Sequence, residues 1–292
     1  MIYENLCELI PIDLGWSVDN KYRATDRDGN TYLLRITKGE KAKGREAMFR
    51  HHERIAKTGI PMCLPLEYGE CEGGVYTLYT WIDGVDAEEY IPTLTAREQY
   101  EYGLRAGKYL AKIHSIPAPD GTPPWRERYG AKIERKKKTY LDCPLKYAND
   151  DFLLSLIEEN RHLIDSRPST YQHGDYHIGN MMVSDGELVI IDFDRFDVGD
   201  PWEEFNRIVW CVAVSPEMAS GMISGYFDGE VPEKFWRLLS LYVATNTLSS
   251  LSWAIPFGEG EIITMREQAC DFECWYDGDC YPVPNWFKGE TK

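Results

Sequence analysis

The chain has 292 residues, enough for one large domain or two modest domains with a hydrophobic core. Its 48 acidic residues exceed its 32 basic residues and give a formal charge of −16, which argues against nucleic acids and anionic membranes as partners and fits a cationic substrate. No apolar run reaches about 18 residues, and Met1–Leu14 lacks the basic start of a secretory signal, so we expect a cytoplasmic protein.

The first part of the chain, to about residue 80, shows short strand patterns and one helix. Val18–Ala24 and Thr31–Ile36 flank the turn residues Asp26–Asn30, and this arrangement predicts a β-hairpin. Gly15 and Ser17 precede the first strand, where their backbone N–H groups could approach phosphate oxygens. The alternative is that Gly15 only makes a turn.

A helix is predicted over about Gly44–Lys57, with Gly59 as its C-terminal stop. Glu46 and Glu53 share one face of this helix, because they lie two turns apart. The strand before the helix carries Arg35, a permanent cation that can bind phosphate through two parallel hydrogen bonds. Either glutamate could pair with it.

The next segment, Val75–Trp81, is an apolar strand followed by Ile82-Asp83-Gly84. Locally, this pattern fits an ordinary turn and a hinge between two lobes equally well. From Thr95 the pattern becomes helical, and Thr95 and Glu98 have the spacing of a capping box. Further helices are predicted at residues 125–140, 150–164, 201–214 and 235–255.

Residues 173–194 form the segment with the strongest chemical signal. Asp185-Gly186 lies between two short apolar runs and predicts a two-residue hairpin turn, because both turn positions need a positive φ. Such a turn pairs position 180 with position 191, so Asn180 and Asp192 emerge at the open end of the hairpin. Asp175 lies on the loop that enters it. These oxygen ligands suit Mg²⁺ ions that also bind phosphate.

The same segment has the spacing of a kinase catalytic loop. His173-Gly174-Asp175 is followed after four residues by Asn180, and Asp192 follows on the next strand. Gly174 replaces the arginine that in protein kinases pairs with a phosphorylated activation loop, and the interval from Asp192 to Asp200 is too short for such a loop. The pattern therefore indicates a kinase for small molecules.

Three motifs together resemble the aminoglycoside phosphotransferase family, within the wider group that includes choline kinases: His173–Asn180, Ile191–Asp194 and Gly199-Asp200-Pro201. The resemblance implies an α+β, protein kinase-like fold with two lobes. A small antiparallel β lobe with one helix would span residues 1–80, residues 81–84 would form the hinge, and residues 85–292 a larger, mainly helical lobe with the catalytic hairpin. The nucleotide would bind between the lobes.

The resemblance also implies roles for individual residues. Asp175 would take the proton of the acceptor hydroxyl, and Asn180 and Asp192 would hold Mg²⁺. Arg35 would neutralise phosphate charge, with Glu46 as its favoured partner because family members carry a glutamate in the early helix turns. The backbone near Thr80 and Ile82 would bind adenine, and that of Gly15 and Ser17 the phosphates.

Residues 257–281 hold seven acidic residues against one basic residue, with aromatic residues interleaved. A pocket for a polycationic amino sugar would use such side chains for charge pairing and ring stacking. An exposed acidic surface is the alternative. The candidate acceptor ligands are Glu259, Glu261, Asp271, Glu273 and Trp275.

The sequence therefore predicts an ATP- and Mg²⁺-dependent O-phosphotransferase, with an aminoglycoside or a related cationic amino-sugar antibiotic as the favoured acceptor. A choline, amino-alcohol or sugar kinase of the same fold is the alternative. A pseudokinase that binds nucleotide without catalysis is the alternative from another class, because Arg35 and the single-glycine loop depart from the kinase pattern. The choice of ATP over GTP, a role in antibiotic resistance and the oligomeric state stay open.

Overall fold

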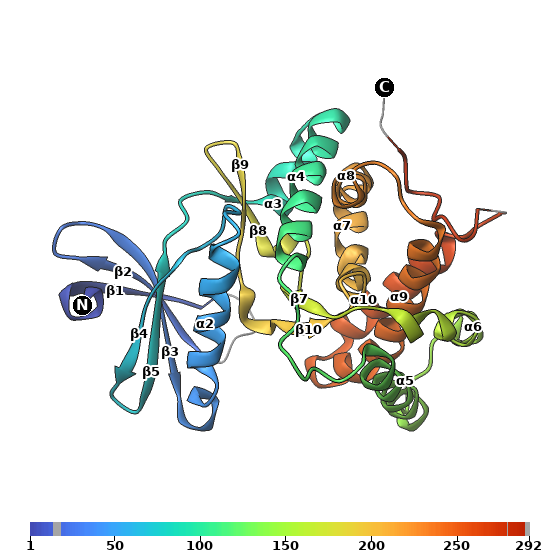
Figure 1. Cartoon of the computed structure of the whole chain (residues 1–292), viewed down its shortest axis with the longest axis horizontal. Coiled ribbons are helices and arrows are strands. Elements are labelled where there is room, and N and C mark those ends of the chain that lie inside the picture. Colours follow the sequence, from blue (N-terminus) through green and yellow to red (C-terminus); the bar gives the residue numbers. More distant parts are fainter. Residues whose placement is uncertain (14–18, 279, 290–292) are drawn as a thin grey trace. The chain divides into compact units, whose positions relative to one another are not determined.

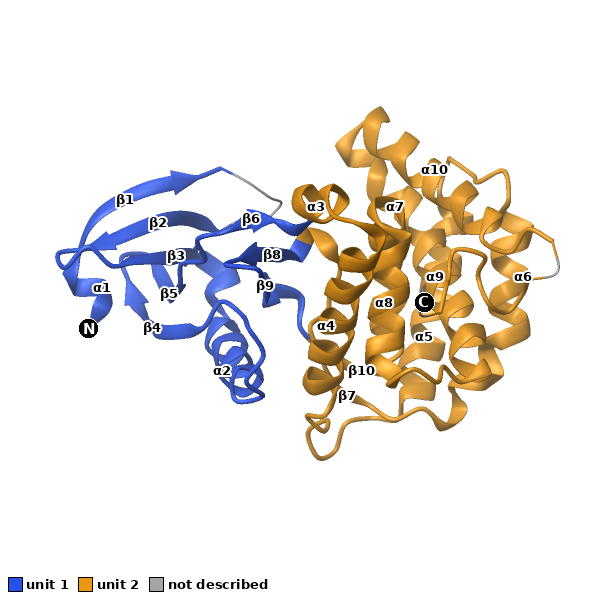
Figure 2. Cartoon of the chain, turned by 90° about the horizontal axis from the view of Figure 1, so that it is seen from above, with its two compact units in different colours: residues 1–87, 180–196 blue, residues 88–179, 197–292 orange. Residues whose placement is uncertain are grey.

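The computed structural model describes residues 1–13, 19–278 and 280–289 (Figure 1). Contacts divide the chain into two compact units (Figure 2). Unit 1 consists of residues 1–87 and 180–196, and unit 2 of residues 88–179 and 197–292. None of the described helices combines the length and the apolar character needed to span a bilayer.

Unit 1 is built on a five-stranded antiparallel sheet with the order β1-β2-β3-β5-β4. Its buried centre is a small cluster of Ala24, Leu34, Tyr76 and Leu78. The predicted hairpin is confirmed, because Asn20 pairs with Ile36 and Thr25 with Thr31. The strands are β1 (Leu6–Ile12), β2 (Asn20–Asp26), β3 (Thr31–Lys38), β4 (Pro65–Cys71) and β5 (Gly74–Thr80), preceded by the short helix α1 (Ile2–Asn5).

Helix α2 (Arg45–Ala56) packs against this sheet through one face. Phe49 and His52 contact aromatic rings of β4 and β5, and Ile55 is buried beside them. The opposite face, with Glu46 and Glu53, is exposed. The predicted helix and its stop are confirmed, because Gly59 follows it with a φ of +70°.

The hairpin of residues 181–190 also belongs to unit 1. Strands β8 (Met181–Ser184) and β9 (Glu187–Ile190) pair around Asp185-Gly186, whose φ values of 50° and 79° confirm the predicted turn. The two-residue strand β6 (Val85–Asp86) completes a sheet with the order β6-β8-β9. The predicted lobes differ from the units here, because backbone hydrogen bonds join Ile190 to residues 61 and 63.

Unit 2 is mainly helical and adds one short antiparallel strand pair, β7 (Thr170–Gln172) with β10 (Asp197–Gly199). The predicted α+β class is therefore confirmed. The capping box of Thr95 and Glu98 forms as predicted. The helices are α3 (Ala87–Tyr90), α4 (Ala96–His114), α5 (Trp125–Asp142), α6 (Asp150–Asn160), α7 (Ile208–Val214), α8 (Pro216–Phe227), α9 (Glu233–Ala254) and α10 (Glu259–Cys274).

Helices α4 and α8 approach each other closely through glycines. A Cβ atom added at Gly107 would lie 2.0 Å from the carbonyl oxygen of Met222, and one at Gly221 would lie 2.1 Å from that of Tyr100. Both distances are shorter than any real contact of a Cβ atom, so only glycine allows this helix packing. Helix α9 runs through the core, and buried residues recur along its whole length.

Candidate active site

The predicted catalytic loop begins in unit 2, directly after β7. The backbone N–H groups of His173 and Gly174 each donate to the carboxylate of Glu204 at 2.7 Å. Glu204 is buried, so these two bonds satisfy a charged group that would otherwise be costly to bury. Glu204, in the segment that precedes α7, thus holds the backbone of the loop in place.

Asp200, which directly follows β10, supports the same loop. Its carboxylate accepts two hydrogen bonds from Arg167, at 2.8 and 2.7 Å, and one from the hydroxyl of Tyr242. Its backbone carbonyl accepts a bond at 2.8 Å from Gln172, the residue before His173. Asp200 has no exposed surface, so it acts as a fully paired internal charge.

The carboxylate of Asp175 is held by a cation that the sequence did not single out. Arg207 Nε lies 3.0 Å from Asp175 Oδ1, and His177 Nε2 lies 3.8 Å from Oδ2. The side chain of Asp175 keeps 15% of its surface exposed, so a ligand can reach it. Arg207 therefore orients this carboxylate without covering it.

Asn180 and Asp192 lie at the open end of the β8–β9 hairpin in unit 1, as predicted, because the N–H of Ile191 donates to the carbonyl oxygen of Asn180 at 3.0 Å. Asp192 has a positive φ of 59°, and its side chain is 51% exposed. No group of three His, Cys, Asp or Glu side chains in the described residues is arranged to hold a metal ion. One carboxylate and one amide fit a Mg²⁺ ion whose other ligands come from phosphate and water.

Arg35 on β3 is buried among carboxylates of unit 1. Its guanidinium lies 3.2 Å from Asp19 and 3.5 Å from Asp192, and it also contacts Asp194. Burial lowers the pKa of Arg35, but the three carboxylates, Asp194 first, outweigh it and leave that pKa raised. Burial likewise raises the pKa of the Asp194 carboxyl, although Arg35 and Arg45 oppose the shift.

The predicted pairing of Arg35 with Glu46 is wrong, and so is the alternative with Glu53. Both glutamates lie on the exposed face of α2, where they contact Arg50 at 3.7 and 2.9 Å. The reason is the orientation of the helix, because Phe49 and the residues that share its face are turned toward the sheet. Arg45, the first residue of α2, turns inward instead and contacts Asp19 at 2.5 Å.

The sequence matches the phosphotransferase enzyme family over residues 8–236. The chain belongs to this family. The predicted family and the predicted enzyme class, a phosphotransferase, are thereby confirmed. No curated protein matches the chain.

Solved structures share the fold of this phosphotransferase at low sequence identity. A choline/ethanolamine kinase family protein from Mesorhizobium loti is 18% identical with a TM-score of 0.66, and the match covers 94% of this chain and 89% of that one. A thermostable mutant of aminoglycoside phosphotransferase APH(4)-Ia, in a ternary complex with ADP and hygromycin B, is 16% identical with a TM-score of 0.66 and coverages of 93% and 95%. Amicoumacin kinase hAmiN, in complex with AMP-PNP, Ca²⁺ and Ami, is 15% identical with a TM-score of 0.61 and coverages of 92% and 88%.

Of the residues predicted to contact adenine and phosphate in this phosphotransferase, the structure describes Thr80 and Ile82. The N–H of Thr80, at the end of β5, already donates to the carbonyl oxygen of Leu64 at 3.0 Å. Ile82 follows β5 outside any helix or strand. Gly15 and Ser17 lie outside the described residues.

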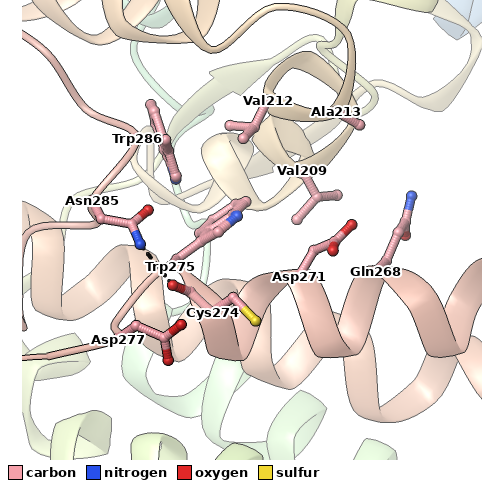
Figure 3. Close-up of a pocket in the computed structure, with 10 residues that line it drawn as sticks. All are labelled: Val209, Val212, Ala213, Gln268, Asp271, Cys274, Trp275, Asp277, Asn285 and Trp286. Carbon is pink, nitrogen blue, oxygen red and sulfur yellow. Dashed lines mark hydrogen bonds between the residues drawn. The ribbon is translucent and has the colours of Figure 1, made fainter.

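A pocket of about 350 Å³ opens in unit 2 between α7 and α10 (Figure 3). The rings of Trp275 and Trp286 meet edge to face, 5.4 Å apart, and Asn285 donates to the carbonyl oxygen of Cys274 at 2.7 Å. Asp271 and Asp277 add two carboxylates to the walls. The lining residues are Val209, Val212, Ala213, Gln268, Asp271, Cys274, Trp275, Asp277, Asn285 and Trp286.

Two of the five predicted acceptor residues, Asp271 and Trp275, therefore meet in one pocket. Glu259 and Glu261 lie in the first turn of α10, and Glu273 is exposed, so none of these three lines it. Composition alone predicted an acidic and aromatic site but did not separate the residues of α10 that face α7 from those that face solvent.

Proposed function

We propose that the chain transfers the γ-phosphoryl group of ATP to a hydroxyl group of a small cationic acceptor. The observation that carries the proposal is the placement of Asp175, whose carboxylate is oriented by Arg207 on a loop that Glu204 holds at two successive N–H groups. A fixed and accessible carboxylate is what the kinase reaction needs to orient the attacking hydroxyl.

In this reaction the acceptor oxygen forms a bond to the γ-phosphorus, the bond from that phosphorus to the β,γ-bridging oxygen breaks, and ADP leaves. Asp175 accepts the proton that the hydroxyl loses. Arg207 keeps the carboxylate in position through its Nε contact with Oδ1 at 3.0 Å, and Oδ2, which lies 3.8 Å from His177 Nε2, is the oxygen proposed to meet the substrate hydroxyl.

Asn180 and Asp192 would hold Mg²⁺, which when bound neutralises charge on the β- and γ-phosphates. Arg35 lies beside Asp192 and adds a permanent positive charge for the same phosphates. The backbone of Thr80 and Ile82 is proposed for adenine, and that of Gly15 and Ser17 for the phosphates. We propose ATP as the donor, with GTP as the alternative.

The pocket between α7 and α10 is proposed to bind the part of the acceptor that is not phosphorylated. Its aromatic pair and its two carboxylates suit a cationic group with an apolar surface. An aminoglycoside or related amino-sugar antibiotic is the first candidate, in keeping with the hygromycin B found in one solved relative. The modest volume of about 350 Å³ favours a choline-like or amino-alcohol acceptor as the second candidate.

The deciding experiment is coupled ADP release with Mg-ATP and a panel of aminoglycosides, macrolides, choline, ethanolamine and simple sugars. Asp175→Asn should lower kcat by about 10²–10⁴-fold while ATP affinity stays within a few-fold. Asp197→Asn is the matched control, because Asp197 is an exposed acid of unit 2 that pairs with Arg128 at the surface. Turnover in Asp175→Asn equal to that of the control would remove Asp175 from its role, and ATP binding without turnover across the panel would favour a nucleotide-binding module without catalysis.

A further inference from the structure

The charged side chains around Arg35 form a closed ring within unit 1. Arg35 contacts Asp19 at 3.2 Å and also contacts Asp194. Arg45 contacts the same two carboxylates, Asp19 at 2.5 Å and Asp194 at 3.3 Å. Cations and anions therefore alternate around the ring, and each arginine bridges the same pair of acids.

Segments that are far apart in the sequence build this ring. Arg35 lies on β3, Arg45 begins α2, and Asp194 follows β9. Asp19 directly precedes β2, its side chain has no exposed surface, and its second oxygen accepts a hydrogen bond from the hydroxyl of Thr37 at 2.9 Å. Because charges persist in such buried places only when they are paired, the ring fixes both guanidinium groups.

We infer that this ring replaces the lysine–glutamate pair with which protein kinases position the nucleotide phosphates. Arg45 is a second phosphate-binding cation beside Arg35, and Asp19 is the positioning residue that holds both. The inference rests on the proposed function, because it adds residues to the same nucleotide site. Asp192, the proposed metal ligand, connects the ring to this site, because it lies 3.5 Å from Arg35.

The chemistry of arginine allows one side chain to pair with carboxylates and bind a phosphate at the same time. A guanidinium group has five N–H donors, and the contacts of Arg45 with Asp19, Asp194 and the sulfur of Met48 do not use all of them. The side chain of Arg45 keeps 14% of its surface exposed, so a phosphate oxygen can reach it. A lysine in its place would keep the charge but could not bridge two carboxylates and a phosphate in one plane.

The test is a binding measurement that needs no acceptor. ATP, ADP and adenosine are titrated by calorimetry into the wild-type chain and into Arg45→Gln. We expect ATP and ADP to bind about ten- to a hundred-fold more weakly in the variant, because a charge-assisted hydrogen bond to phosphate is lost, while adenosine affinity stays within twofold. Arg50→Gln is the matched control, since Arg50 lies on the exposed face of the same helix.

Equal losses for ATP and adenosine, or an ATP affinity equal to that of Arg50→Gln, would overturn the inference. If Arg45→Gln does not fold, Arg45→Lys replaces it, with an expected several-fold loss for ATP alone. A wild-type chain that binds no ATP overturns the proposed function as well. Full acceptor turnover together with unchanged ATP affinity in both Arg45 variants overturns only the role of Arg45.

The positioning role of Asp19 is tested separately, by comparing the change in kcat with the change in ATP affinity. Asp19→Asn should lower kcat at least tenfold with a smaller change in ATP affinity than Arg45→Gln shows, because the cations remain but lose their alignment. Asp19→Glu should restore part of kcat. Loss of folding cooperativity without such a split between kcat and affinity would make Asp19 a purely structural residue. A greater loss of ATP affinity in Glu46→Gln than in Asp19→Asn would reinstate Glu46 as the partner of Arg35.

Discussion

The two units use buried carboxylates in opposite ways. In unit 2, Asp200 and Glu204 are paired with side chains and backbone N–H groups of their own unit, and both hold the catalytic loop in place. In unit 1, Asp19 and Asp194 are paired with two arginines, next to the half-exposed Asp192. Buried carboxylates thus support a backbone in unit 2, and in unit 1 they pair with the two arginines that we propose for the nucleotide phosphates.

This difference predicts which property of the protein each substitution will change. Replacing a carboxylate that supports a backbone should cost stability of the chain, and replacing one that positions cations should cost nucleotide binding or turnover. Substitutions of the unit 2 carboxylates should therefore lower the free energy of unfolding, and those of the unit 1 carboxylates should lower nucleotide affinity or turnover, when both quantities are measured for each variant.

The largest expected effect is that of Asp200→Ala. The substitution leaves the buried guanidinium of Arg167, which stacks 3.5 Å over the ring of Trp202, without its carboxylate partner. Loss of one partner of a buried ion pair costs about 3–5 kcal/mol. Urea unfolding should show this loss, while the fraction that stays folded should bind ATP like the wild type.

Asp197→Ala is the control for this experiment, because Asp197 is a half-exposed acid on β10 whose salt bridge to Arg128 lies at the surface. Its expected effect is below about 1 kcal/mol. A loss in Asp200→Ala no greater than in the control would show that the buried pair is not what holds the loop. A matching loss of ATP affinity in the folded fraction would break the separation between the two units.

The sequence predicted the parts of the site that depend on local chemistry. Asp185-Gly186 determined the hairpin turn, because few other residue pairs tolerate two positive φ values, and the register then brought Asn180 and Asp192 to one end. The capping box and the strand pairing around Asp26–Asn30 followed from equally local rules. The α+β class followed from the sum of such elements.

The parts that failed depend on tertiary packing. Glu46 and Arg45 are neighbours in the sequence, and only the packing of α2 on the sheet decides that Arg45 faces inward. Asp19 has no motif of its own, and neither has Arg207, so no local pattern marks them as partners of Arg35 and Asp175. Arg45 lies within one helical turn of the predicted residue Glu46, but its position in the sequence does not determine which way its side chain faces.

The pocket proposed for the acceptor allows a comparison between two residues of the α10 segment. Trp275→Ala should raise the KM of a cationic acceptor by about five- to thirty-fold, because one ring of the pair with Trp286 is lost, and it should leave the KM of ATP unchanged. Glu273→Gln, at an exposed position of α10 that does not line the pocket, should change neither value. An acceptor KM that stays constant in Trp275→Ala would show that the acceptor binds elsewhere, and a rise in both KM values would point to loss of folding.

The smallest expected effect concerns a cluster of positive charges around Lys136 in unit 2, in contrast to the alternating charges around Arg35 in unit 1. Burial lowers the pKa of Lys136 to about 7, and the nearby cations, Lys132 first, add to the shift against the opposing pull of Glu203. The pKa in the unfolded chain is near the ordinary 10.5, so the folded chain binds fewer protons between these two values. Stability should therefore rise with pH across this window, and the full cost of the charge is present below pH 7.

Lys136→Met removes that charge and should stabilise the chain at pH 6 by about 1 kcal/mol, a discounted value because Lys136 is half-buried and donates to Asn246 at 3.1 Å. The gain should shrink as the pH approaches 9, where the wild-type lysine is mostly neutral in the folded chain. Lys138→Met, at an exposed position of the same helix, should show no such pH dependence. A gain in stability that is constant from pH 6 to pH 9 would mean that added apolar contact stabilises the variant, and not the removal of a buried charge. In that case the clustered cations around Lys136 would not destabilise unit 2, and they would not differ in this respect from the alternating charges around Arg35 in unit 1.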